Sequence, residues 1–214
     1  MPRMLLVRNN YDTITFYMHE WSLPLKEEAE RKGMHVDCVD GKNVTRKEVI
    51  SRLENTDAML IILNGHGTKT SFFGSENHPI LTATDASLFA ERVVFVRACD
   101  CAAGLGREAA ERHGCTAFIG YQYEFVNVRQ NTKEARPLED EISRPIWEAS
   151  NAVPLSLIKG RTVEEAVQAS HTKAEIGMLR LLQSPEPHAI SVLKAMLTND
   201  VGLCYFGEGE AAVQ

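Results

Sequence analysis

Two apolar runs constrain the fold of this chain more than any other feature of the sequence. Residues 58–63 are apolar throughout, and residues 92–98 form a second run that is apolar between its end residues, apart from Arg97. Strands of this kind suit a sheet that is covered by other elements on both faces, as parallel sheets usually are. The two runs therefore predict buried, neighbouring strands of an α/β fold.

The rest of the first two-thirds of the chain alternates short strands with helical stretches. Capping boxes mark two helix starts, at Thr45-x-x-Glu48 and Thr162-x-x-Glu165. This rhythm implies right-handed crossovers and a mostly parallel sheet of roughly six strands with helices on both faces. The predicted strands are 4–7, 35–39, 58–63, 92–98, 116–120 and 201–206, and the predicted helices are 21–32, 45–54, 85–91, 104–112, 138–150, 162–181 and 190–197.

Length and composition narrow the classes of protein. The 214 residues suggest one domain spanning 1–214, without a separate sensor or targeting domain. The 29 Asp and Glu residues outnumber the 23 Lys and Arg residues, for a net charge of −6, so we expect neither a nucleic-acid nor a membrane partner. We see no signal peptide, and no apolar run approaches the roughly 20 residues of a membrane-spanning helix. Five cysteines form an odd set that does not indicate a disulfide framework, so a reducing, cytoplasmic location is expected.

Reactive side chains follow the two buried strands. His66 comes just after residues 58–63, between Gly65 and Gly67, and Cys99 comes just after residues 92–98. The carboxyl ends of parallel strands are where α/β proteins gather their catalytic groups. A thiol and an imidazole on neighbouring strand ends are the parts needed for nucleophilic catalysis, and the start of the helix near Gly104 would favour the thiolate.

The order of these motifs resembles the caspase-like (clan CD) cysteine peptidases, most of all the bacterial CHAT and gingipain-like proteases. The segment Leu60–Gly67 looks like the histidine motif of that superfamily, and Val93–Cys99 looks like its cysteine motif. The likeness continues through three further segments in the same order, Ala117–Tyr121, Gly160–Ala166 and Leu203–Gly209. The resemblance implies a caspase-like α/β sandwich.

The resemblance also implies an activity. A cysteine endopeptidase of this kind uses Cys99 as nucleophile and His66 as its partner on a protein or peptide substrate. The backbone amides of Gly67 and Cys99 would form the oxyanion site. No cofactor and no metal are expected.

Three residues near the nucleophile are candidates for substrate binding. Relatives carry a pocket-lining residue two positions before the cysteine, and Arg97 stands there in this chain. Arg97 would disfavour basic residues before the cut, whereas Asp100 or Glu124 could reverse that preference. The alternative is that Arg97 is an ion-paired structural residue of the strand.

Other interpretations remain open. Cys101-Ala-Ala-Gly-Leu-Gly-Arg107 fits the C-x-x-G-x-x-R loop of cysteine phosphatases, although Glu108 would repel a phosphate dianion. A zinc site from Cys99, Cys101, His113 and Cys115 is disfavoured because the helix between the two pairs holds them about 13 Å apart. The chain could also be an inactive caspase-like binding module.

The resemblance suggests how such a protease is controlled. Residues 122–139 are polar and could form a mobile substrate-binding or activation loop, or an ordinary solvated loop. Many bacterial relatives act in antiviral defence against phage and are switched on by a partner protein or a small signalling ligand. We therefore expect a latent protease that needs such an activator.

Overall fold

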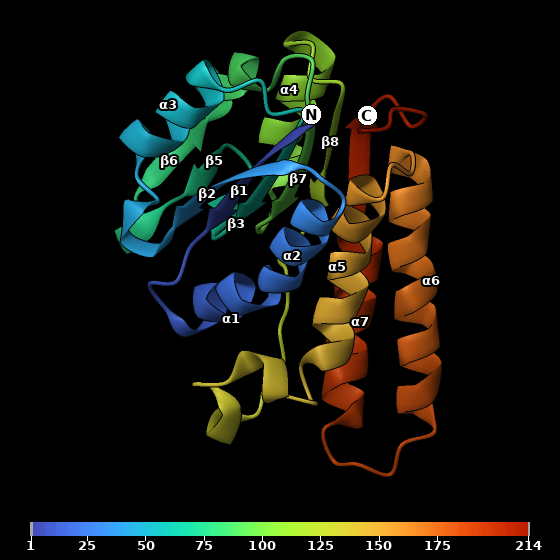
Figure 1. The fold of residues 1–214 in the computed structure, drawn as a ribbon. Coiled ribbons are helices and arrows are strands. Elements are labelled where there is room, and N and C mark those ends of the chain that lie inside the picture. The colour runs from blue at the N-terminus through green and yellow to red at the C-terminus, as the bar shows by residue number, and fades with distance from the viewer. Residues whose placement is uncertain (1, 214) are drawn as a thin grey trace.

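A six-stranded sheet forms the centre of the protein. The computed structural model describes residues 2–213. The strand order is β2-β1-β3-β7-β8-β9, with every neighbouring pair parallel except β8 and β9. The predicted mostly parallel α/β sheet is confirmed (Figure 1). The strands are β1 (Arg3–Arg8), β2 (His35–Asp40), β3 (Leu60–Asn64), β7 (Val93–Arg97), β8 (Ala117–Tyr121) and β9 (Leu203–Gly207).

Helices cover both faces of this sheet and bury a separate core on each. The larger core packs under α1, α2, α5, α6 and α7, and the smaller one under α3 and α4 (Figure 1). Side chains of β7 alternate between the two cores, since Val93 and Phe95 belong to the first and Val94 and Val96 to the second. The helices are α1 (Thr13–Trp21), α2 (Leu23–Arg31), α3 (Arg46–Asn55), α4 (Leu105–Arg112), α5 (Arg144–Ile158), α6 (Val163–Leu182) and α7 (Ala189–Gly202).

Local sequence sets the helix starts. Thr45 and Thr162 cap α3 and α6 as predicted, each accepting a hydrogen bond from the backbone amide three residues later. Asp12 caps α1 in the same way through Thr15. Pro145 lies in the first turn of α5, where the missing N–H of proline is tolerated.

A small antiparallel sheet follows the histidine motif. It consists of β4 (Gly67–Thr68), β5 (Ser71–Phe73) and β6 (Pro79–Thr82). For the polar residues 68–78 the sequence favours a loop or a small hairpin, and β4 and β5 form the hairpin, whereas β6 was not predicted. The hairpin projects from the edge of the main sheet at which β3 ends, so it places its side chains beside His66.

Several elements differ from the sequence prediction. The predicted helix 21–32 is the second of two helices, since the chain turns at Ser22 and Pro24 lies in the first turn of α2. Residues 83–89 form a 3₁₀ segment rather than an α-helix. The last helix runs on to Gly202, so the last strand begins only at Leu203.

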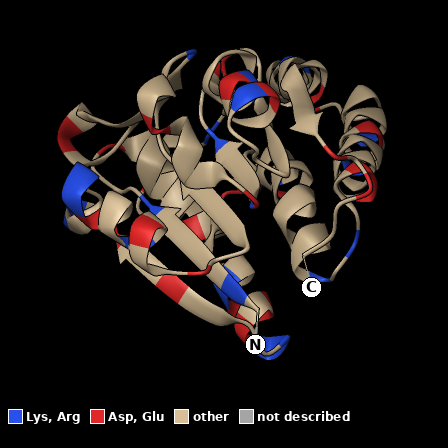
Figure 2. Cartoon of the chain, turned by 90° about the horizontal axis from the view of Figure 1, so that it is seen from above, with Lys and Arg blue, Asp and Glu red and all other residues tan. Residues whose placement is uncertain are grey.

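The surface carries both signs of charge. Lys and Arg are interspersed with Asp and Glu over the elements seen in Figure 2. No helix within residues 2–213 combines the length and the apolar character that crossing a membrane requires.

Candidate active site

The two candidate catalytic residues follow strands that pair in register. Asn64 at the end of β3 lies opposite Arg97 at the end of β7, and His66 and Cys99 each stand two residues further on. The amide of Gly65 donates a hydrogen bond to the Arg97 carbonyl (3.2 Å), so the two chains stay together beyond the strands. His66 and Cys99 are thus brought to the same edge of the sheet.

His66 is held by a carboxylate that the sequence analysis missed. Its Nε2 lies 2.7 Å from Oδ2 of Asp12, the residue that caps α1, and the Tyr11 ring meets the imidazole edge-on at 5.8 Å. Partial burial alone would raise the pKa of Asp12, but hydrogen bonds from the Thr15 amide and from His66 hold that pKa below its usual value. A carboxylate only accepts hydrogen bonds, so Nε2 carries the proton and Nδ1 is left to act on a substrate or a thiol.

Asp12 could not be found from spacing alone, because it lies 54 positions before His66 in the sequence. The available signal was Asp12 followed by Thr15, a pattern that marks a helix start. This pattern places a carboxylate at the N-terminus of α1. That helix covers the same face of the sheet as the core against which Cys99 packs.

Cys99 is half-buried and its sulfur accepts a hydrogen bond. The amide of Phe125 lies 3.4 Å from Cys99 Sγ. Burial raises the pKa of the Cys99 thiol, and the carboxylates of Glu124 and Asp100 add to that rise, against the lowering effect of the Phe125 amide. Burial of Cys99 therefore opposes the thiolate that the start of the helix near Gly104 was expected to favour.

Gly67 lies directly against the cysteine motif. A Cβ at this position would come within 2.9 Å of both the Cys99 carbonyl oxygen and the Ala98 Cβ, and would collide with Cys101 Sγ. Only glycine therefore lets the histidine motif pack this closely on the cysteine motif. The two residues predicted to supply oxyanion amides, Gly67 and Cys99, are neighbours in space.

Arg97 does not face a substrate, and the expectation that it lines a pocket is wrong. Its side chain is fully buried and donates to Asn64 (2.9 Å), Ser150 (2.8 Å) and Asn151 (2.6 Å), while its guanidinium also lies 5.4 Å from the Trp147 ring. Burial lowers its pKa to about 10, so the group stays charged at neutral pH. It is a structural residue of β7, held by neutral partners rather than by the ion pair considered above.

The two acidic candidates remain beside the nucleophile. Asp100 adopts a left-handed backbone conformation (φ 58°) and donates its amide to the Tyr123 carbonyl (3.2 Å). Glu124 is exposed in the segment after β8. Asp100 directly follows Cys99, and Glu124 directly precedes Phe125, whose amide lies 3.4 Å from Cys99 Sγ, so both acidic residues lie near the nucleophile.

The phosphatase loop is not assembled. The Cys101 side chain is fully buried, its sulfur lies 3.5 Å from the Ser71 carbonyl, and burial raises the pKa of its thiol far above the usual value. The Arg107 guanidinium lies 5.0 Å above the Phe206 ring, with an exposed side chain, whereas the Cys101 thiol is buried. A phosphate therefore could not be bound between them and attacked by the thiol.

No group of three or more His, Cys, Asp or Glu side chains in residues 2–213 is arranged to hold a metal ion. The zinc set considered from the sequence is split, because Cys115 lies beyond the far end of α4 and bonds the Arg92 carbonyl through its sulfur.

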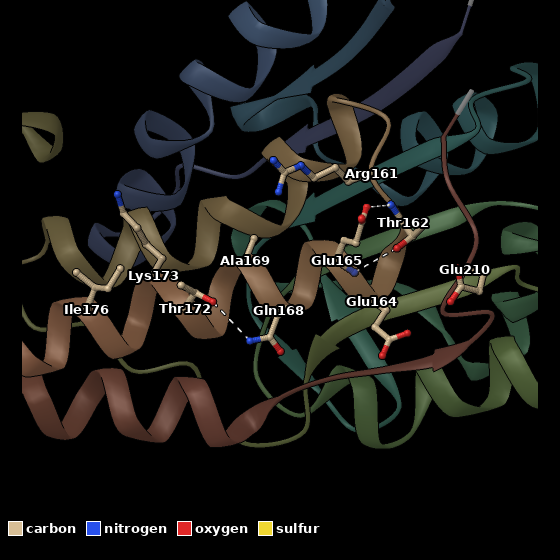
Figure 3. A pocket seen from close by; sticks show the side chains of 10 residues that line it. All are labelled: Arg161, Thr162, Glu164, Glu165, Gln168, Ala169, Thr172, Lys173, Ile176 and Glu210. Carbon is tan, nitrogen blue, oxygen red and sulfur yellow. Dashed lines mark hydrogen bonds between the residues drawn. The ribbon is translucent and has the colours of Figure 1, made fainter.

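Two hollows bear on the location of the site. One of about 320 Å³ opens beside His66 and is lined by Tyr11, Asp12 and the β4–β5 hairpin. Another, of about 690 Å³, lies along α6 and the segment near Glu210 (Figure 3). Its lining includes none of the predicted catalytic residues, and the side chains of Thr162 and Glu165 there cap α6.

Comparison with known proteins identifies the fold. No protein-family model and no curated protein sequence matches the chain. The structure is similar to the crystal structure of gingipain R, an Arg-specific cysteine proteinase, with a TM-score of 0.60 and 12% identity over 99% of this chain and 47% of that chain. It is also similar to the complex of the pro- and mature domains of RgpB from Porphyromonas gingivalis, with a TM-score of 0.62 and 12% identity over 99% of this chain and 48% of that chain.

These similarities show the caspase-like fold and confirm the predicted architecture. The chain spans about half the length of the gingipain chains that it matches.

Proposed function

We propose that this chain is a caspase-like cysteine endopeptidase, in which Cys99 is the nucleophile and His66 its acid–base partner. The observation that carries the proposal is the placement of both residues two positions past the paired ends of β3 and β7, on the fold of a cysteine proteinase. The carboxylate of Asp12 on His66 adds the third group that such a pair needs to stay oriented.

The geometry suggests how these groups would cleave a peptide bond. Cys99 transfers its proton to Nδ1 of His66 as its sulfur attacks the carbonyl carbon, and the amides of Gly67 and Cys99 stabilise the oxyanion. His66 then gives the proton to the leaving amine, which leaves a thioester on Cys99. Water hydrolyses the thioester, regenerating the thiol and releasing the acid.

We infer a preference for a basic residue next to the cut. The carboxylates of Asp100 and Glu124 lie beside the nucleophile. The Arg97 side chain is buried in the interior, so it does not repel a basic substrate residue. Gingipain R, one of the structures with this fold, is described as Arg-specific. Substitution of Glu124 by Gln should therefore weaken cleavage after Arg and Lys more than cleavage after neutral residues.

We further propose that the chain acts as a single peptidase domain in the cytoplasm, latent until a partner protein or a small signalling ligand switches it on. The raised pKa of the Cys99 thiol supports latency, because a protonated thiol is a poor nucleophile. The resemblance to bacterial CHAT-type proteases favours a role in defence against phage. High turnover by the purified, unprocessed chain without any activator would contradict this part of the proposal.

The test compares four proteins on a fluorogenic peptide panel and on an aryl phosphate: the wild type and the Cys99→Ala, His66→Ala and Cys101→Ala variants. We expect the first two substitutions to abolish peptide cleavage and Cys101→Ala to retain it. Phosphatase activity that disappears with Cys101→Ala would overturn the assignment. Peptide cleavage that survives Cys99→Ala would do the same.

A further inference from the structure

A side chain of the last helix, Asn199, forms hydrogen bonds to the backbone of the segment that contacts Cys99. Asn199 on α7 is almost fully buried, and its amide group makes two hydrogen bonds to the backbone of a single residue, Val126. The Val126 amide donates to Asn199 Oδ1 (2.8 Å), and Asn199 Nδ2 donates to the Val126 carbonyl (2.8 Å). Both the position and the orientation of this stretch of backbone are fixed by that pair of bonds.

The preceding residue, Phe125, donates a hydrogen bond to the sulfur of Cys99. Phe125 precedes Val126, and its amide is the group that lies 3.4 Å from Cys99 Sγ. The Phe125 ring is buried between Tyr121 (4.9 Å) and Trp147 (5.4 Å), which anchors the other side of the same residue. The Phe125 amide is thus held in place by the packing of its own ring and by the two hydrogen bonds of Asn199 to the next residue.

The electrostatic surroundings make that amide important. Two carboxylates act on the pKa of Cys99, that of Asp100 on its own segment and that of Glu124 on the segment after β8. His66 is the proposed acceptor of its proton, and the neighbouring Cys101 thiol is neutral because its own pKa is raised. Both carboxylates oppose a thiolate. The Phe125 amide is a hydrogen-bond donor from outside the cysteine motif that favours it.

We propose that Asn199 is a positioning residue for the nucleophile, which holds the Phe125 amide in place as a hydrogen-bond donor to the Cys99 thiolate. This inference rests on the proposed role of Cys99, and it extends the site to α7, the helix that leads directly into β9. A hydrogen bond to a charged group is stronger than one between neutral groups, so releasing the amide should penalise the thiolate more than the thiol.

The test measures the reactivity of Cys99 without any peptide substrate. The rate of iodoacetamide modification of Cys99 is followed by mass spectrometry from pH 6 to pH 11 in the wild type and in Asn199→Ala. We expect a rate about tenfold lower at pH 7 in the variant, a pH profile displaced to the alkaline side, and an unchanged plateau at high pH. Thr198→Ala is the matched control, because Thr198 is exposed and its hydroxyl bonds only the Lys194 carbonyl of its own helix.

A different result has a distinct meaning. If the segment merely covers the thiol, Asn199→Ala would make modification faster at every pH, and that outcome would overturn the proposal. An unchanged profile would overturn it as well. Loss of peptide cleavage is not used as the readout, so a failure of the proposed peptidase activity does not decide this test.

A second measurement uses the native chain, so it does not depend on whether Asn199→Ala folds. The ¹⁵N and ¹H shifts of the Phe125 amide are followed through the titration of Cys99. We expect them to change with the same midpoint as the alkylation profile, and to stay constant in Cys99→Ser over that range. A Phe125 amide that does not respond to the titration of Cys99 would refute the contact on which the proposal depends.

Discussion

The chain places two cysteines one residue apart and gives them opposite environments. Cys99 packs beside the core under α1 and α5, is half-exposed, and lies at the same edge of the sheet as His66. Cys101 belongs to the core under α3 and α4 and is fully buried. Alternation along β7 places Cys99 on the same side as Val93 and Phe95, and would place Cys101 there too. The left-handed backbone at Asp100 (φ 58°) breaks that alternation, so Cys101 turns into the other core and only Cys99 reaches solvent.

The same alternation explains Arg97. Its side chain follows Val93 and Phe95 on the α5-facing side of β7, so it points into the larger core just before Cys99 emerges at the edge of the sheet. Arg97 thus links the end of β7 to α5 by hydrogen bonds. Cys99 follows two residues later, so this link supports the backbone on which Cys99 lies.

The largest expected effect is a loss of stability, and it tests whether Arg97 has a structural role. Arg97→Met should lower the free energy of unfolding by about 3–5 kcal/mol, because it leaves the buried oxygens of Asn64 and Asn151 without their donor. Urea denaturation measures this loss. Arg107→Met is the control, since that arginine is exposed over Phe206, and it should cost less than about 1 kcal/mol. Equal losses in the two variants would contradict the structural role of Arg97.

A second substitution tests whether the Asp12 carboxylate is needed for peptide cleavage at Cys99. Asp12→Asn keeps a side chain that caps α1 but removes the carboxylate from His66, so kcat/KM for peptide cleavage should fall about a hundredfold. The free energy of unfolding should change by less than about 1 kcal/mol. Full activity in Asp12→Asn would show that the carboxylate does not orient His66.

The sequence predicts some parts of this arrangement much better than others. The positions of the main-sheet strands follow from apolar runs, which are local signals, and the strands that carry His66 and Cys99 are neighbours as expected. The antiparallel direction of β9 and the extra strand β6 depend on long-range packing and were not foreseen. The pairing of Asp12 with His66 joins residues whose contact no local pattern encodes.

Arg97 shows the same limit in the opposite direction. Its place two residues before the nucleophile suggested a pocket, but its partners Asn64, Ser150 and Asn151 come from β3 and α5. Whether a charged strand residue faces a substrate or the core depends on those partners, which a single sequence does not bring together.

The smallest expected effect concerns the buried thiol. Cys101→Ala should cost about 1 kcal/mol at pH 7 and leave peptide cleavage within a fewfold of the wild type. Because burial raises the pKa of the folded Cys101 thiol, the folded state binds more protons than the unfolded state above about pH 8.5, and stability falls as the pH rises. Cys101→Ala should flatten that alkaline decline in urea titrations at pH 7 and pH 10, and a decline as steep as in the wild type would contradict the burial of this thiol.

The most direct test of the account identifies the sulfur that a bound peptide reaches. A peptidyl acyloxymethyl ketone with Arg next to the reactive group is incubated with the chain, and the modified residue is mapped by mass spectrometry in the wild type and in His66→Ala. We expect modification at Cys99 alone, at a rate that falls when His66 is removed. Modification at Cys101, or a rate at Cys99 that does not depend on His66, would contradict the central claim.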